Sequence, residues 1–332
     1  MYILGIDCGG TSTDALLTTL DGAVLGRGQG GPANFTTNGV GGVVQSSYEA
    51  MQKCLAESGL DLAEIQPQVT LALGVSGAGR AAEQHEVRQE FEAAGFSSVV
   101  VAHDAHIALL GALSGADGVA VIAGTGSIAY GLHAGRSHRV GGWGYLLGDE
   151  GGAFWIALQA LQRVMRAYDG RLPQDQVLLE AVKNYFHVNG PSELVPIIYK
   201  MPLDRGFIGG FCAVIGKLAE QGHGPSREIL AAAGCQLGRL AVAALAELGL
   251  AGKEGRVAAC GGVFSAGKWV LDPMQEMIKL AAPGQRLSLP DFKPAAGAVF
   301  LAARHLGLQL PLISAGLRGS LDQNEGKGWG TG

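Results

Sequence analysis

An aspartate and a turn rich in glycine and hydroxyl groups follow the first apolar segment of the chain, residues 3–6. The turn contains Gly9, Gly10, Thr11, Ser12 and Thr13. Glycines let backbone N–H groups approach an anion closely, and the hydroxyls add further donors, so this turn is a candidate phosphate-binding loop. Asp7 could hold Mg²⁺ through water, because Mg²⁺ prefers oxygen ligands and keeps much of its hydration shell. The other interpretation is an ordinary tight connection between strands.

Two later turns repeat this arrangement of an apolar strand that runs into glycine. The segment 119–123 leads to Gly124, Thr125, Gly126 and Ser127, and the segment 255–260 leads to Gly261 and Gly262. Three turns of this kind would hold a nucleoside triphosphate from both sides and cover its adenosine. The repetition therefore favours a nucleotide site, with ATP as the expected nucleotide, over isolated β-connections.

Asp104 is the candidate catalytic acid. It follows a predicted strand, 98–102, and the carboxyl ends of parallel strands are where ligands bind. A carboxylate that accepts the proton of the attacking hydroxyl recurs in phosphoryl transfer. Asp104 also begins a predicted helix, so helix capping is a second role, compatible with the first. His103 beside it is a weaker candidate for tuning that acid.

The segment 141–152 combines glycines with Trp143, Asp149 and Glu150, which excludes a regular helix or strand. Its backbone N–H groups and indole suit a sugar ring, and its acids can accept sugar hydroxyls. The alternative is a surface loop held by its own tryptophan. Asn34 could bind a polar substrate through its amide, although an asparagine in such a loop is also a common turn residue.

The remaining pattern predicts the elements that position these residues. A β-meander is expected over residues 2–28. Helices are expected over 40–58, 82–94, 156–168, 175–186, 225–248 and 294–306, and further strands over 69–75, 98–102, 119–123, 128–133 and 255–260. The polar, glycine-rich link 114–118 marks a domain boundary.

Length and composition set the class of the protein. At 332 residues with 48% hydrophobic residues, the chain predicts two domains. The net charge of −5, with scattered Lys and Arg, argues against nucleic acid or anionic membrane as partners. No basic leader or uninterrupted apolar run of about 18 residues occurs. Five dispersed cysteines without zinc spacing predict buried thiols. We expect a soluble, cytoplasmic protein.

In this order the motifs resemble the BadF/BadG/BcrA/BcrD-type ATPase family, and within it the N-acetylglucosamine kinase-like branch of the sugar kinase, heat-shock chaperone and actin superfamily. The resemblance extends to about Leu308. It is carried by the first turn at 5–13, the second at 123–127, the adenosine turn at 260–264, Gly297-Ala298 in the last helix, and above all the Gly-Gly-Trp-Gly-x-x-x-Gly-Asp-Glu-Gly pattern of 141–151.

The resemblance implies an α/β fold of two ribonuclease H-like, actin-like ATPase domains with a nucleotide cleft between them. It implies an N-terminal domain of residues 1–115 plus 295–312, a C-terminal domain of residues 116–294, and a disordered tail over 313–332. The implied activity is ATP-dependent phosphorylation of the 6-hydroxyl of an amino-sugar, most simply N-acetylglucosamine, with glucosamine or N-acetylmuramic acid as other acceptors. A homodimer would be ordinary for this family.

The family pattern also implies roles for individual residues. Asp104 would be the base, and Asp7 would organise Mg²⁺. The phosphates and adenosine of ATP would be held by Gly9, Gly10, Thr11, Ser12, Thr13, Thr125, Gly126, Ser127, Gly261 and Gly262, and the amino-sugar by Asn34, Asp104, Thr125, Gly142, Trp143 and Asp149. Two positions depart from the pattern: His103 stands where relatives often carry Asn, and Gly152 where they often carry Ser.

The main alternative is an ATPase that drives a conformational change in a partner enzyme, as in activators of 2-hydroxyacyl-CoA dehydratases. Such activators hold an iron–sulfur cluster, yet no cysteine lies between Cys54 and Cys212. An actin-like scaffold would not need the tryptophan loop. The sugar-kinase branch with a structural zinc is disfavoured because no cysteine cluster exists.

Overall fold

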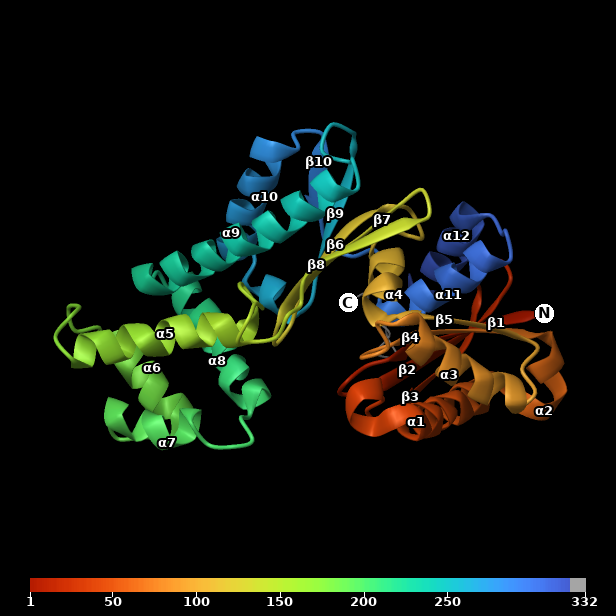
Figure 1. Cartoon of the computed structure of the whole chain (residues 1–332), viewed down its shortest axis with the longest axis horizontal. Coiled ribbons are helices and arrows are strands. Elements are labelled where there is room, and N and C mark those ends of the chain that lie inside the picture. Colours follow the sequence, from red (N-terminus) through yellow and green to blue (C-terminus); the bar gives the residue numbers. More distant parts are fainter. Residues whose placement is uncertain (323–332) are drawn as a thin grey trace. The chain divides into compact units, whose positions relative to one another are not determined.

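The computed structural model describes residues 1–322, which group into two compact units (Figure 1). Unit 1 contains residues 1–120 and 131–135 and the chain from Leu289 onward, and unit 2 contains residues 121–130 and 136–288. The sequence predicts an N-terminal domain that ends at residue 115 and resumes at 295. The structure extends that unit to Ala120, adds the β-turn at 131–135, and starts the returning segment six residues earlier.

Unit 1 is built on a five-stranded sheet of order β3-β2-β1-β4-β5. The strands are β1 (Tyr2–Cys8), β2 (Thr13–Thr19), β3 (Val24–Gly30), β4 (Val69–Val75) and β5 (Ser98–His103). The first three pair antiparallel as the predicted meander, and β1, β4 and β5 are parallel. All seven residues of β4 are buried, as expected for a strand covered on both faces.

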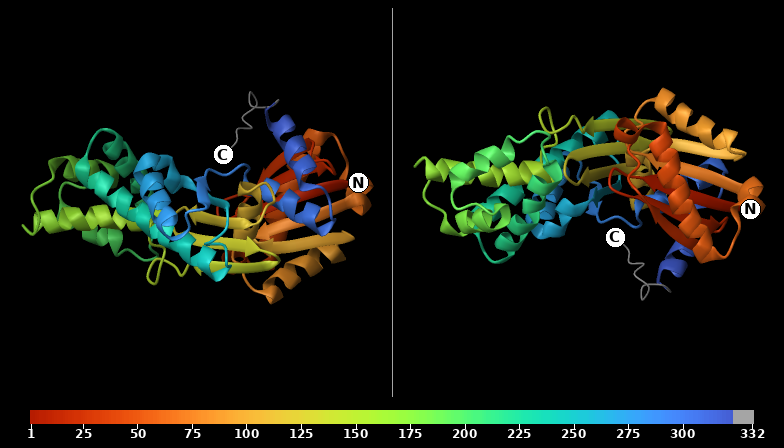
Figure 2. Two further views of the ribbon diagram at one scale, coloured as in Figure 1. Left: turned by 90° about the horizontal axis from the view of Figure 1, so that it is seen from above. Right: turned by 90° about the horizontal axis from the view of Figure 1, so that it is seen from below.

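Helices cover both faces of this sheet, as Figures 1 and 2 show. They are α1 (Phe35–Ser58), α2 (Leu62–Ile65), α3 (Ala81–Ala93), α4 (Asp104–Ala112), α11 (Pro294–His305) and α12 (Leu310–Asp322), with a 3-10 turn η1 at Gln66–Gln68. Helix α11 packs closely against β1 and α4. A Cβ atom at Gly297 would collide with the carbonyl oxygen of Ile107, so only glycine allows this approach. Helix α4 thereby holds Asp104 at a fixed place.

The end of the chain differs from the sequence-based prediction. A disordered tail is expected from residue 313, but residues 310–322 form α12. Ile313, Leu317 and Leu321 recur at intervals of four and are buried, and the hydroxyl of Ser320 accepts a 3.0 Å hydrogen bond from Val24 N–H of β3. Burial of this apolar stripe stabilises a helix that local composition does not favour. The rest of the predicted tail, 323–332, lies outside the described residues.

Unit 2 repeats the same strand plan. Its sheet has the order β10-β9-β6-β7-β8. The strands are β6 (Gly118–Ala123), β7 (Ser127–His133), β8 (Arg136–Gly141), β9 (Gly255–Cys260) and β10 (Gln285–Ser288). Read from the other edge, the hairpin strands β8-β7-β6 precede β9 and β10, just as β3-β2-β1 precede β4 and β5. The sequence-based prediction of a repeated arrangement is confirmed at the level of sheet order.

Helices make up the rest of unit 2: α5 (Ala153–Tyr168), α6 (Gln176–Phe186), α7 (Leu194–Ile198), α8 (Arg205–Glu220), α9 (Gly224–Glu247) and α10 (Lys268–Ala281), with 3-10 turns η2 (Pro191–Glu193) and η3 (Gly262–Ala266). Helix α9 is the single described helix with the length and mean hydropathy, 1.7, of a membrane span, and half of its most apolar window is buried. It packs against α10 and α8, as a core helix does. Close approach of α10 requires Gly234 and Gly238.

Candidate functional site

The β-register of unit 1 gathers carboxylates at one edge of the sheet. Asp7 lies opposite Asp14 of β2 and beside Gly74 of β4, and the neighbouring strand β5 ends at His103, directly before Asp104. Burial, and then the charges of Asp104 and Asp14, raise the pKa of Asp7 to about 7. A nearby cation would offset both the burial and the charge repulsion, and it would therefore stabilise the ionised form of this carboxylate. Asp7 is therefore chemically suited to a bound metal ion.

The turn between β1 and β2 has the form predicted for a phosphate loop. Gly9 N–H donates to the carbonyl of Ser12 at 3.0 Å, and Gly10 and Thr11 are exposed at the tip. The hydroxyl of Thr13 is buried and donates to Gly31 at 2.8 Å, which fixes the turn against the loop after β3. Gly10 and Thr11 are thus free to meet a ligand, the half-buried Ser12 donates its hydroxyl to Oδ2 of Asp14 at 3.4 Å, and Thr13 has a structural role.

Asp104 begins α4 at the end of β5, as predicted. Its Oδ1 atom lies 2.9 Å from Nδ1 of His103 and accepts a hydrogen bond from Ala105 N–H at 2.7 Å. Burial alone raises the pKa of Asp104, but the hydrogen bonds from His103, Ser76 and the Ala105 backbone, together with the His103 charge, outweigh it and hold that pKa below the usual value. Asp104 is therefore an ionised carboxylate at neutral pH.

Asn34 occupies the cap position of α1, which begins at Phe35, five residues before the predicted start. Its Oδ1 accepts hydrogen bonds from the N–H groups of Thr36 and Thr37, and its Nδ2 donates to the hydroxyl of Ser76 at 3.1 Å. Asn34 therefore caps a helix, and its amide also donates a hydrogen bond to Ser76, which lies beside Asp104. That Asn34 binds a polar substrate stays a prediction.

In unit 2, the second glycine turn is joined to the start of α5. Gly124 N–H donates to Gly126 at 3.0 Å, and the carbonyls of Gly124 and Thr125 accept from Ala153 and Phe154 N–H. The hydroxyl of Ser127 is buried and donates to the carbonyl of Glu150 at 2.7 Å, so it ties the turn to the tryptophan loop. Thr125 and Gly126 remain the parts of this turn that can reach a ligand.

The tryptophan loop holds Asp149 tightly against that turn. Asp149 is only 8% exposed, has a positive φ of 62°, and makes no described side-chain hydrogen bond. A Cβ atom at Gly126 would lie within 3.0 Å of both its carboxylate oxygens, and one at Gly152 would collide with the backbone of Gly126. A buried carboxylate in a strained conformation without a protein partner is a strong sign of a ligand contact.

Trp143 lies on the same loop and is 62% exposed. The guanidinium of Arg139 lies 4.3 Å from the centre of its ring, and Gly142 precedes it with a φ of 68°. A cation on one face holds the indole in place and leaves apolar surface for a further contact. The loop therefore offers an acid, backbone donors and an exposed aromatic surface, as predicted from its composition.

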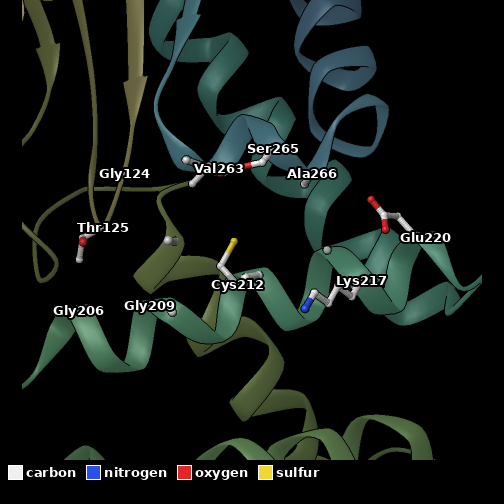
Figure 3. Close-up of a pocket in the computed structure, with 15 residues that line it drawn as sticks. Gly124, Thr125, Gly206, Gly209, Cys212, Lys217, Glu220, Val263, Ser265 and Ala266 are labelled. Atoms are coloured by element: carbon white, nitrogen blue, oxygen red, sulfur yellow. Dashed lines mark hydrogen bonds between the residues drawn. The ribbon is translucent and has the colours of Figure 1, made fainter. Parts of the chain in front are cut away.

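A cavity of about 550 Å³ lies within unit 2, beside the second and third glycine turns (Figure 3). Gly124 and Thr125 line one end, and Lys217 and Glu220 of α8 line the other. Four residues of η3 form one wall: Gly262, Val263, Ser265 and Ala266. Gly261 has a φ of 104°, and a Cβ there would collide with Ala123, so this glycine lets β9 turn sharply beside β6.

The opposite wall of the cavity is helix α8, which the sequence analysis did not identify. Small residues and one thiol of α8 line it: Gly206, Gly209, Gly210, Cys212, Ala213 and Gly216. Their spacing of three and four residues places most of them on one helix face, and this spacing was the feature of the sequence that could have indicated the wall. Burial raises the pKa of Cys212 to about 11, so the thiol contributes a neutral, apolar surface.

The sequence and fold match known proteins over nearly the whole chain. An N-acetylmuramic acid/N-acetylglucosamine kinase of Clostridium acetobutylicum is 28% identical over 91% of this chain and 98% of its own. A glucosamine kinase of Vibrio cholerae is 32% identical over 62% of this chain and 68% of its own. A Chromobacterium violaceum structure assigned as an N-acetylglucosamine kinase superposes with a TM-score of 0.69 at 27% identity, over 91% of this chain and 98% of its own.

These similarities fit two ribonuclease H-like units, each with the same strand order and each with a glycine turn after its first strand. They also agree with the predicted fold class. Residues 4–302 match the BadF/BadG/BcrA/BcrD ATPase family, and the chain belongs to that family.

Proposed function

We propose that this protein transfers the γ-phosphoryl group of ATP to the 6-hydroxyl of an amino-sugar, with N-acetylglucosamine as the first candidate acceptor. Its family and its relatives make it an ATP-dependent sugar kinase. Glucosamine and N-acetylmuramic acid are the other candidate acceptors, since relatives named for these sugars match the chain.

The observation that carries this proposal is the ionised Asp104 at the end of β5, held by three donors. A sugar hydroxyl is a weak nucleophile, and a carboxylate next to it can take its proton as the new bond forms. In the proposed step the O6–P bond forms, the bond from the γ-phosphorus to the β,γ-bridging oxygen breaks, and the O6 proton moves to Asp104. ADP leaves with the bond electrons.

ATP would be held by backbone and hydroxyl groups of both units. The cavity of unit 2 would take the adenosine, with Gly261 and Gly262 at its wall and Thr125 and Gly126 at its phosphate end. Turn β1–β2 of unit 1, with Gly9, Gly10, Thr11 and Ser12, would add donors to the phosphates. The small residues of α8 suit a flat purine, because they leave room next to the helix backbone.

The amino-sugar would be bound by Asp149, whose carboxylate has no described partner, and by Gly142 and Trp143 of the same loop. Asn34 and Thr125 complete the proposed set. Carboxylates accept hydrogen bonds from sugar hydroxyls, and an indole packs on the apolar face of a sugar ring. Discrimination between acceptors would depend on how this loop meets the substituent on the sugar nitrogen.

Mg²⁺ fits the site through Asp7. The described residues hold no group of three or more acids, histidines or cysteines that would cage a metal directly. A single half-buried carboxylate with a raised pKa is the kind of group that binds hydrated Mg²⁺. When bound, the ion would neutralise phosphate charge. The protein's own contribution is to keep Asp7 at the edge of the sheet near Asp104.

An ADP-release assay over a panel of sugars tests this function. The panel should contain N-acetylglucosamine, glucosamine, N-acetylmuramic acid, N-acetylmannosamine and glucose, with identification of the phosphorylated position by NMR. We expect an amino-sugar to give the highest kcat/KM and the product to carry phosphate on O6. If no sugar raises ADP release above the basal rate, the kinase function is wrong. If phosphate appears at another hydroxyl, the regiochemistry is wrong.

A further inference from the structure

Two side chains outside the predicted site contact the proposed base from different elements. His103, the last residue of β5, reaches Oδ1 of Asp104 through Nδ1 at 2.9 Å. Val75 pairs with His103 in the β4–β5 register, so the next residue, Ser76, lies beside Asp104, and its side chain lowers the pKa of that carboxylate. The sequence pattern raised His103 only as a weak candidate, and Ser76 not at all. Ser76 approaches Asp104 through the register of β4 and β5, whereas His103 is its neighbour in the chain.

The hydrogen-bond directions in this group are determined by its chemistry. Ala105 N–H lies 2.7 Å from Oδ1 of Asp104 and 3.2 Å from Nδ1 of His103, so its better acceptor is the carboxylate. Nδ1 of His103 is then free to donate its own proton to Asp104. Asn34 Nδ2 donates to the hydroxyl oxygen of Ser76 at 3.1 Å, which leaves the Ser76 proton for the carboxylate.

We propose that Ser76 and His103 form a carboxylate clamp, a pair of positioning residues that fix the orientation of Asp104 and keep it ionised for proton abstraction. This inference rests on the proposed function, since it assigns roles toward the base of that reaction. Oδ1 is occupied by His103 and Ala105, so rotation of the carboxylate is restricted. The orientation of a base strongly affects the rate of the reaction, because a small misplacement of the base slows proton transfer.

The clamp also explains how this chain accommodates histidine at position 103. The ring lies at the cap position of α4, and its Cδ2 edge lies 3.7 Å from the position a Cβ of Gly79 would take. The side chains of His103 and Asp104 are 22% and 33% exposed, so the pair is partly shielded from water. Asparagine could donate one amide hydrogen bond to Asp104 from the same position, whereas alanine could donate none.

Kinetics of clamp variants test the inference in the full-length protein. We expect His103→Ala and Ser76→Ala each to lower kcat about 10- to 100-fold with KM for both substrates changed less than about threefold, and His103→Asn to keep kcat within about fivefold of wild type. Circular dichroism and the thermal midpoint of each variant control for folding. A rise in sugar KM without loss of kcat would show a substrate-binding role and overturn the proposal, as would equal losses in His103→Asn and His103→Ala.

The pH dependence gives a second readout. The clamp lowers the pKa of Asp104, and protonated Asp104 cannot act as base, so loss of a donor should move the acid limb of the kcat profile to higher pH. The other titratable groups nearby are Asp7 and Cys8 of β1, whose pKa values the Asp104 charge raises, and His106 of α4, which interacts with His103. An unshifted limb in both alanine variants would contradict the clamp.

A direct titration separates this inference from the proposed function. The carboxyl ¹³C signal of Asp104, assigned by its absence in Asp104→Asn, should titrate at higher pH in His103→Ala and Ser76→Ala than in wild type. This measurement needs no sugar turnover. If no sugar is phosphorylated but the signal shifts, the function fails and the electrostatic part of the clamp remains. If sugar is phosphorylated and the signal does not move, the clamp fails and the function remains.

Discussion

The two units use the same strand order but provide different chemistry after their first strands. In unit 1 the region around β1, β2 and β5 carries Asp7, Asp14 and Asp104. Burial and the neighbouring acids raise the pKa of Asp7, whereas hydrogen bonds and the His103 charge lower the pKa of Asp104. In unit 2 the region around β6 and β9 is built from glycine turns and a glycine-lined helix, and it contains a cavity. A common scaffold thus supports a charged, reactive edge in one unit and a shaped, largely uncharged recess in the other.

This difference predicts that chemistry and nucleotide binding can be separated by mutation. Asp104→Asn should lower kcat about 10³-fold, because it removes the proton acceptor of the reaction. The affinity for a fluorescent ATP analogue should change less than about twofold, since the cavity belongs to the other unit. Stopped assays and fluorescence titration measure the two quantities. Full activity in this variant would exclude Asp104 as the base, and a parallel loss of nucleotide affinity would contradict the separation.

Beside the second glycine turn of unit 2, the buried acid Asp149 lies against Gly126. Gly126→Ala would drive a Cβ into the Asp149 carboxylate, which is buried and cannot move freely. We expect sugar kcat/KM to fall about 100-fold, with the larger part in KM for the sugar. Gly252→Ala, an exposed position with no atom within 4 Å of its new Cβ, is the matched control. An equal effect of both changes would refute this contact as the cause.

The raised pKa of Asp7 predicts how much the acids of unit 1 reduce the folding stability of the protein. The pKa of Asp7 is about 7 in the folded protein against an ordinary value of 3.8, so the folded state binds the proton more tightly than the unfolded state. This penalty is absent below about pH 4, grows as pH rises and is complete above about pH 7. The full shift corresponds to about 4 kcal/mol, and access of water to this half-buried group reduces the expected value to about 2 kcal/mol.

Asp7→Asn should therefore stabilise the ligand-free protein by about 2 kcal/mol at pH 8 and by almost nothing at pH 4, although it should impair Mg²⁺-dependent activity. Urea unfolding at the two pH values measures the difference. Glu86→Gln, which removes an exposed carboxylate of the same unit, is the control. Equal stabilisation at both pH values would show that the gain comes from a source other than the raised pKa.

Local patterns predicted most of the charged edge and less of the recess. The strands and glycine turns were predictable because apolar runs and turn residues act over a few neighbours, and Asp104 was placed by the strand before it. Ser76 gained its place beside Asp104 from strand register, which local sequence does not contain, whereas His103 directly precedes Asp104 in the chain. The need for glycine at position 152 is explained only by the backbone of Gly126 against it.

The recess was harder to predict because its wall is a helix without a strong helical composition. Helix α8 contains four glycines, which disfavour helix in isolation, and packing of its buried face against α5 outweighs that preference. Helix α12 was missed for the same reason, since burial against unit 1 stabilises it. Tertiary packing decided both cases, and a single sequence gives no view of the surface onto which a helix packs.

The glycines of α8 provide the finest test of the comparison, because they should affect space and leave charge unchanged. Gly216 lines the cavity, and its nearest neighbour on the cavity side, Cβ of Ala266, lies 3.9 Å from where a new Cβ would stand. Gly216→Leu should raise KM for ATP about 10-fold through lost volume, with kcat and KM for the sugar within about twofold of wild type. Gly216 is buried, and a larger side chain there can overpack its surroundings, so the thermal midpoint of the variant controls for lost folding.

Gly319→Leu supplies the matched control, since Gly319 lies on an exposed face of α12 with no atom within 4 Å of its new Cβ. It makes the same change of residue in a helix of unit 1, far in sequence from any proposed ligand contact. Steady-state kinetics with each substrate varied in turn should find KM for ATP raised in Gly216→Leu alone. If kcat falls in Gly216→Leu while KM for ATP stays constant, the recess affects the geometry of the reacting groups. Nucleotide binding and chemistry would then be separated between the two units less completely than their residue types indicate.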